Sequence, residues 1–230
     1  MLRLRIRAKG VMAKINSSIH PENRIAILFA AIFPIIAVSI GLHLLHNGWA
    51  AILLYHAGML SVMARYGSFR GLRRHAVSGF RVFPCLVMMV FCAFSGVLVY
   101  LLWPLIYSSE IPFGSLLSQY GLGPRSRILF ILYFSIIHPV IEESYWRGWF
   151  SHSETNVAPW LEDISFATFH VFVLVLFIHP IWILVAFAVL VAIANIWRKT
   201  DKHFGGLALP LLSHAVADIT IVVAGFIAAS

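Results

Sequence analysis

Seven ionisable side chains interrupt long apolar stretches of this sequence, at positions where a charge is costly. They are His138, Glu142, Glu143, Arg147, His170, His214 and Asp218. An ionisable group at the centre of a membrane costs about 2.5–3.5 kcal/mol on insertion scales, so seven unpaired groups would cost on the order of 20 kcal/mol. We therefore expect these side chains to contact one another or water, and an acid and histidine cluster of this kind is a candidate functional site.

The spacing of these residues predicts which side chains share a helix face. His214 and Asp218 are four residues apart, and side chains at that spacing lie one above the other on a helix. Glu143 and Arg147 have the same spacing, with the acid on the N-terminal side, which is the better orientation for an ion pair. The sequence thus predicts a histidine–carboxylate face on one helix and an ion pair on another.

The segments that carry these residues have the composition of membrane-spanning helices. The chain has 230 residues, of which 60% are hydrophobic and 11% are charged, whereas soluble domains carry about 25% charged residues. A spanning helix needs about 20 mostly apolar residues. We predict an all-α, polytopic transmembrane helix bundle of about seven spans. The expected spans are residues 26–45, 49–64, 83–107, 128–150, 162–178, 181–197 and 206–228.

The basic residues predict how the bundle is oriented. They gather in the N-terminal segment, between the second and third spans, and between the sixth and seventh, and seven spans place all three segments on one side. Lys and Arg mark the cytoplasmic side, so we expect a basic cytoplasmic N-terminal segment at 1–25. Three transmembrane helices follow at 26–107, and a core of four at 120–228. The net charge of +8 is then topogenic, which favours a lipid bilayer as partner and argues against nucleic acid.

Three of the polar side chains are expected at one depth in the bilayer. Glu142, His170 and His214 each lie eight residues from the predicted cytoplasmic end of their span. At 1.5 Å per residue this is about 12 Å for each of them. The sequence therefore predicts that one acid and two imidazoles from three helices meet in a shared pocket.

Three short motifs carry a resemblance to a known family. Glu142 to Arg147 matches EExxxR, Phe166 to His170 matches FxxxH, and His214 to Asp218 matches HxxxN/D. In this order and on separate apolar segments, they resemble the CPBP family, which includes the CAAX prenyl endopeptidases and bacterial self-immunity proteins. The resemblance covers about residues 120–225, so it identifies the predicted core at 120–228 as CPBP-like and catalytic.

The resemblance implies a glutamate-dependent intramembrane endopeptidase. Glu142 would activate a water molecule with help from His170, while His214 and Asp218 would stabilise the tetrahedral oxyanion. Another interpretation of the family makes Glu142, His170, His214 and Asp218 the ligands of a metal ion, for which zinc is the candidate. We favour the mechanism without a metal or other cofactor.

Asp218 departs from the family pattern, because many members have Asn there. An Asn can donate an N–H to an oxyanion, whereas an ionised Asp cannot. Asp218 could instead be protonated, or it could orient His214 or His138 as a hydrogen-bond acceptor. Two histidines and two carboxylates also make a metal site more plausible than in members with Asn.

Supporting roles are expected for the neighbouring residues. Glu143 and Arg147 form a buried pair that fixes the helix, and Phe166 packs against the site. His138 lies four residues before Glu142 and shares its face. We interpret His138 as a packed or hydrogen-bonded histidine rather than as a catalyst.

Two other classes of function compete with hydrolysis. The chain could be a non-catalytic membrane binding or immunity protein, or a transporter or proton relay, since intramembrane acids and histidines serve those functions too. The complete set of Glu142, His170 and His214 favours catalysis over sequestration, and the sequence lacks the paired halves with broken helices of many transporters. We expect a peptide or membrane-protein substrate and a bacterial inner-membrane location.

Overall fold

The computed structural model describes residues 24–66, 69–152 and 160–228. Every element that it forms within these ranges is helical, and the one β-type contact among them is an isolated bridge between Tyr107 and Ile178. The prediction of an all-α bundle is therefore confirmed. The predicted basic segment at 1–25 falls outside the described residues except for its last two positions.

The helices follow one another along the chain with short connections. Their bounds are α2 Arg24–Val38, η1 Ser39–Leu44, α3 Gly48–Tyr66, α4 Phe69–Ala76, α5 Val82–Ile106, α6 Phe113–Gln119, α7 Pro124–Leu132, η2 Tyr133–Ile137, α8 His138–Glu143, η3 Ser144–Trp149, η4 Phe150–His152, α9 Trp160–Leu174, α10 Pro180–Phe204 and α11 Ala208–Ala228. Each of the seven predicted spans corresponds to one of these helices or to a run of them.

Five stretches of helix among the described residues are long and apolar enough to cross a membrane. They are Ile27–Leu44, Val82–Ile106, Pro124–Trp149, Pro180–Phe204 and Ala208–Ala228. α9 has 15 residues, about 22 Å of helix, which is shorter than the roughly 30 Å hydrocarbon core. α3 has 19 residues but is less apolar. The predicted count of about seven spans is therefore approximate.

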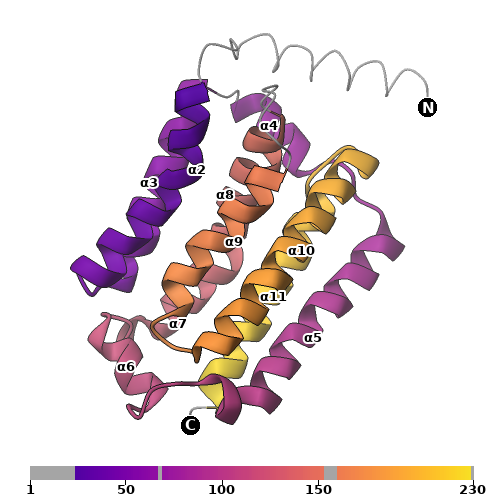
Figure 1. The fold of residues 1–230 in the computed structure, drawn as a ribbon. Coiled ribbons are helices and arrows are strands. Elements are labelled where there is room, and N and C mark those ends of the chain that lie inside the picture. The colour runs from indigo at the N-terminus through magenta and orange to yellow at the C-terminus, as the bar shows by residue number, and fades with distance from the viewer. Residues whose placement is uncertain (1–23, 67–68, 153–159, 229–230) are drawn as a thin grey trace, which may run out of the picture.

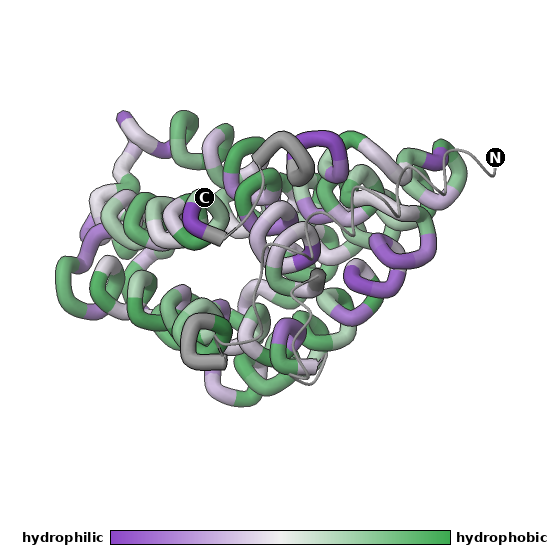
Figure 2. The backbone as a smooth tube through the Cα atoms, turned by 90° about the horizontal axis from the view of Figure 1, so that it is seen from above, coloured by the Kyte–Doolittle hydropathy of each residue, from purple (hydrophilic) through white to green (hydrophobic). Residues whose placement is uncertain are grey.

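The outward faces of the bundle are apolar. Phe83 is 77% exposed and Val90 71% exposed on α5, and comparable side chains cover the other long helices. Figure 2, a view along the bundle from above, shows hydrophobic residues over most of the helical tubes. This surface suits a lipid environment, because there is no net cost in exposing apolar side chains to hydrocarbon.

Close helix packing holds the bundle together. α2 and α3 lie side by side at one edge, α5 lies at the opposite edge, and α8 to α11 lie between them (Figure 1). α5 packs along α11, where a side chain added at Gly96 would meet the backbone of Thr220. Small residues of this kind allow the backbones of membrane helices to approach closely.

The helical run that carries the first motif is irregular where its catalytic candidates lie. α8 is flanked by two π-helical segments, η2 and η3. Pro139 follows η2 closely, and a proline can neither donate a hydrogen bond to the carbonyl of Ser135 nor tolerate that carbonyl in the usual position. The wider π turn relieves this conflict, and such turns are frequent at functional sites.

Candidate active site

Glu142 is the centre of a buried polar cluster. Its side chain is 0% exposed, and its Oε1 accepts a hydrogen bond of 2.5 Å from the hydroxyl of Tyr55. Its Oε2 is buried and accepts no hydrogen bond from any described residue. One oxygen of this carboxylate is thus held by the protein, and the other is open to a bound water, substrate or ion.

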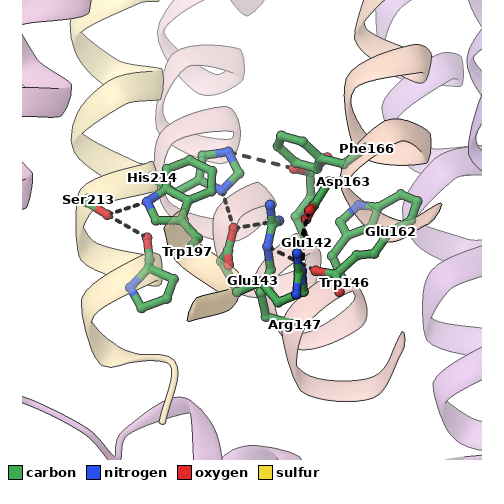
Figure 3. Close-up of polar contacts among 12 residues, drawn as sticks. Glu142, Glu143, Trp146, Arg147, Glu162, Asp163, Phe166, Trp197, Ser213 and His214 are labelled. Atoms are coloured by element: carbon green, nitrogen blue, oxygen red, sulfur yellow. Dashed lines mark hydrogen bonds and ion pairs between the residues drawn. The ribbon is translucent and has the colours of Figure 1, made fainter. Parts of the chain in front are cut away.

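His214 on α11 connects the two adjacent glutamates. Its Nδ1–H donates to Oε1 of Glu143 over 2.8 Å, and its Nε2 lies 3.7 Å from Oε2 of Glu142 (Figure 3). The same Nε2 lies 3.5 Å from Oδ1 of Asp218. The ring also stacks on Trp197, with centroids 4.6 Å apart. The orientation of the imidazole is therefore fixed at Nδ1 by Glu143 and on one ring face by Trp197.

The structure also contains the predicted pair of Glu143 and Arg147. Nη1 of Arg147 lies 3.1 Å from Oε1 of Glu143, and its Nε lies 3.4 Å from Oε1 of Glu162. The guanidinium lies 4.3 Å from the centre of the Phe166 ring. A buried arginine between two carboxylates and an aromatic face fixes Glu143, which in turn fixes His214.

His170 and Phe166 of the second motif lie beside this cluster. Nδ1–H of His170 donates to the carbonyl of Phe166 over 2.7 Å, and the Phe166 ring lies 6.0 Å from that of His214. Within the described ranges, no hydrogen bond or ion pair joins His170 to Glu142. The structure therefore brings Glu142, Glu143, His214 and Asp218 into contact more directly than it does His170.

His138 lies closer to Glu142 than a merely packed residue would. Its Nε2 is 3.3 Å from Oε1 of Glu142, and its Nδ1 is 3.0 Å from Nε2 of His56. Nδ1 of His56 in turn lies 2.8 Å from the hydroxyl of Tyr133. The expectation of a hydrogen-bonded histidine agrees with this arrangement, which also places His138 against the candidate base.

One group of side chains in the described part of the chain has the geometry to hold a metal ion. It consists of His138, Glu142 and His214, whose ligand atoms all lie within 4.8 Å of one another. Asp218 adjoins the group through its 3.5 Å separation from His214. This set differs from the predicted metal set, because His138 takes the place of His170.

Several residues at the site escaped the sequence analysis. Tyr55 and His56 come from α3, Trp146 donates its Nε1–H to the Tyr55 hydroxyl over 3.3 Å, and Glu162 lies against Arg147. Trp146 lies at a variable position of the EExxxR motif, and Glu162 begins the predicted span at 162–178. Adjacent polar residues in the less apolar α3 are the sequence signal that could have pointed to Tyr55 and His56.

The fold and the site together define a polytopic membrane protein with a buried acid and histidine centre. Residues 124–220 match the family model of type II CAAX prenyl endopeptidase Rce1-like proteins. No curated protein and no solved structure matches the chain. The family resemblance predicted from the three motifs is confirmed over the matched residues, which hold all three motifs. The protein is an integral membrane protein whose residues 124–220 are similar to type II CAAX prenyl endopeptidases.

Proposed function

We propose that this protein is an intramembrane endopeptidase that hydrolyses a peptide bond with a water molecule activated by Glu142. The observation that carries the proposal is the state of the Glu142 carboxylate. Its Oε1 is bound to Tyr55, while its Oε2 is buried, free of hydrogen bonds from the described residues and 3.7 Å from Nε2 of His214. A carboxylate oxygen facing an imidazole across such a gap suits general-base catalysis.

The proposed reaction uses the remaining groups in distinct roles. Glu142 takes a proton from the water, whose oxygen attacks the substrate carbonyl, and later returns that proton to the leaving amine. His214 in its doubly protonated form donates Nδ1–H to Glu143 and keeps Nε2–H for the developing oxyanion. His170 helps Glu142 to activate the water and uses its Nε2 for this, since its Nδ1–H donates to the carbonyl of Phe166. Asp218 orients His214.

A second version of the same reaction uses a metal ion, and one observation favours it. Nε2 of His138 lies 3.3 Å from Oε1 of Glu142, and Nε2 of His214 lies 3.7 Å from Oε2 of Glu142 and 3.5 Å from Oδ1 of Asp218. With one ligand atom from each residue, His138, Glu142 and His214 lie within 4.8 Å of one another. Ligand bonds of about 2.0–2.1 Å in a tetrahedral zinc site place neighbouring ligand atoms about 3.4 Å apart. These four residues would hold the ion, and the ion would polarise water and the substrate carbonyl.

We propose the metal-free version, because the side chains themselves can supply each role. Glu142 is the base, His214 is the oxyanion donor, and Glu143 and Asp218 orient His214. The substrate is proposed to be a peptide or membrane protein. We further propose a bacterial inner-membrane location with a cytoplasmic N-terminus, from the distribution of basic residues. Nucleic acid is not a proposed partner.

Replacement of Glu142 tests the proposed function. Cells expressing the wild-type protein or Glu142→Gln are compared by proteomics of membrane-protein termini, with equal insertion verified by membrane fractionation. We expect termini that appear only with the wild-type protein. A prenylated peptide ending in a Cys-aliphatic-aliphatic-X sequence, the substrate class in the family's name, serves as the purified probe. If the variant and the wild type generate the same termini and the same phenotype, the chain is a binding protein instead.

A further inference from the structure

α3 lies outside the segment that matches the family model, yet it contributes to the candidate active site. The match begins at residue 124, whereas Tyr55 and His56 are 1% and 2% exposed within the bundle. α3 packs against both α8 and η3, the helical segments that carry the EExxxR motif. Two adjacent side chains of α3 are thereby placed against the two residues of α8 that face the open centre.

Tyr55 binds one particular oxygen of the general base. Its hydroxyl accepts Nε1–H of Trp146 over 3.3 Å and donates to Oε1 of Glu142 over 2.5 Å. Because Trp146 can only donate, the hydroxyl hydrogen is directed to the carboxylate. The ring is held against Phe169, with centroids 4.9 Å apart. Tyr55 therefore occupies Oε1 and leaves Oε2 as the oxygen that can take a proton from water.

His56 acts on the same oxygen through His138. A proton on Nε2 of His138 faces Oε1 of Glu142 at 3.3 Å, and Nδ1 of that ring must then accept a proton from Nε2–H of His56 at 3.0 Å. Nδ1 of His56 in turn accepts the hydroxyl hydrogen of Tyr133 at 2.8 Å.

The opposite direction of this series of hydrogen bonds is unfavourable when no cation is bound. It would place the lone pair of His138 Nε2 against a carboxylate oxygen. The hydrogen-bond partner of one ring nitrogen decides which tautomer a histidine adopts, so His56 sets the tautomer of His138.

We propose that Tyr55 and His56 are positioning residues of the hydrolytic site, which fix the Glu142 carboxylate so that only its Oε2 reacts. This inference rests on the proposed function and names the part of it that α3 supplies. Neither side chain touches the open centre itself, so both act through Glu142. A general base that is displaced by about 1 Å loses on the order of 100-fold in rate.

The test uses conservative variants and separates kcat from KM. Tyr55→Phe removes the hydroxyl but keeps the ring against Phe169, and we expect kcat for the prenylated peptide to fall by about 10- to 100-fold with KM unchanged. His56→Phe should show the same pattern. His56→Gln keeps an N–H donor in the position of Nε2 and should restore most of the lost kcat. A packing role alone would not distinguish Gln from Phe in this way.

Matched controls remove comparable groups that do not reach Glu142. Tyr145 is fully buried and its hydroxyl donates to the carbonyl of Ala30 over 2.8 Å, so Tyr145→Phe loses a similar hydrogen bond without touching the base. His43→Phe removes an imidazole that bonds to the carbonyl of Phe172. Both controls should keep kcat within about twofold of the wild-type value.

A second readout does not depend on peptide cleavage. The melting temperatures of Tyr55→Phe, Glu142→Ala and the double variant in detergent form a cycle, and the two effects should not add if the side chains interact. Wild-type kcat in Tyr55→Phe, or equal inactivity of His56→Gln and His56→Phe, would overturn the positioning role while hydrolysis at Glu142 stands. A wild-type protein that cleaves no substrate overturns the proposed function instead, and the thermal cycle still decides whether Tyr55 holds Glu142.

Discussion

His214 donates its Nδ1–H to Glu143 over 2.8 Å, whereas its Nε2 lies 3.7 Å from Glu142. The two adjacent glutamates of the EExxxR motif therefore act on opposite nitrogens of one imidazole. Oε1 of Glu143 accepts from both His214 and Arg147, whereas Oε1 of Glu142 accepts from Tyr55 and its Oε2 faces the open nitrogen of His214. In the proposed reaction, Glu143 holds the histidine and Glu142 activates the water.

Glu143→Gln should lower activity without removing the base. The amide oxygen of Gln can still accept Nδ1–H of His214, but it carries no charge to stabilise a protonated imidazole next to it. We expect kcat to fall by about 10- to 100-fold while KM changes little. Steady-state kinetics with the prenylated peptide measure this, with Glu142→Gln as the inactive reference. Full activity in Glu143→Gln would show that His214 does not work in its protonated form.

Arg147→Met should destabilise the fold more than it affects the chemistry. The guanidinium is 0% exposed and lies 3.1 Å from Glu143 and 3.4 Å from Glu162. Removing it takes away the cation that lies between the buried carboxylates of Glu143 and Glu162, and breaking a buried pair costs about 3–5 kcal/mol. We expect a clear drop in melting temperature in detergent.

A charge-neutral control follows from the same network. In Glu143→Gln/Arg147→Met/Glu162→Gln all three buried charges are gone, so part of the lost stability should return. A triple variant less stable than Arg147→Met would show that hydrogen bonding of these side chains, rather than compensation of charge, holds the network together.

Asp218→Asn tests the residue at which the chain departs from its family. In the proposed mechanism Asp218 only orients His214, and an Asn at 3.5 Å from Nε2 can still accept a hydrogen bond and can also donate one to an oxyanion. We expect kcat/KM within about threefold of the wild type, and a strong loss in Asp218→Leu. If Asn and Leu are equally inactive, the negative charge of Asp218 is itself required.

The sequence contained enough information for the fold class and for most of the motif residues. Spacing of four residues brought His214 next to Asp218 and Glu143 next to Arg147, because side-chain neighbours on a helix follow from its periodicity alone. Helix existence was equally accessible from the apolar runs. The number of spans was not, since α9 is only 15 residues long and its burial depends on its neighbours.

The contribution of α3 could not be predicted, for a physical reason. Tyr55 and Glu142 are 87 residues apart in the sequence, and no periodicity within one helix encodes a contact between two. The interaction depends on how α3 packs against α8, and the π-helical segments on either side of α8 alter its local winding. The same limit explains why His138 rather than His170 joins the group that surrounds the open centre.

Metal dependence separates the two versions of the proposed reaction. In the metal-free version, purified protein carries far less than one zinc per chain, and cleavage continues after treatment with a chelator, because Glu142 and His214 need no ion. Elemental analysis and kinetics in the chelator measure both quantities. Stoichiometric zinc with loss of cleavage on chelation would contradict this version. Equilibrium dialysis could then identify the ligand set. His138, Glu142 and His214 offer ligand atoms within 4.8 Å of one another. His138→Ala should therefore lower the zinc affinity by at least about tenfold, whereas His170→Ala should leave it unchanged. Equal losses in the two variants would instead support the set predicted from the family.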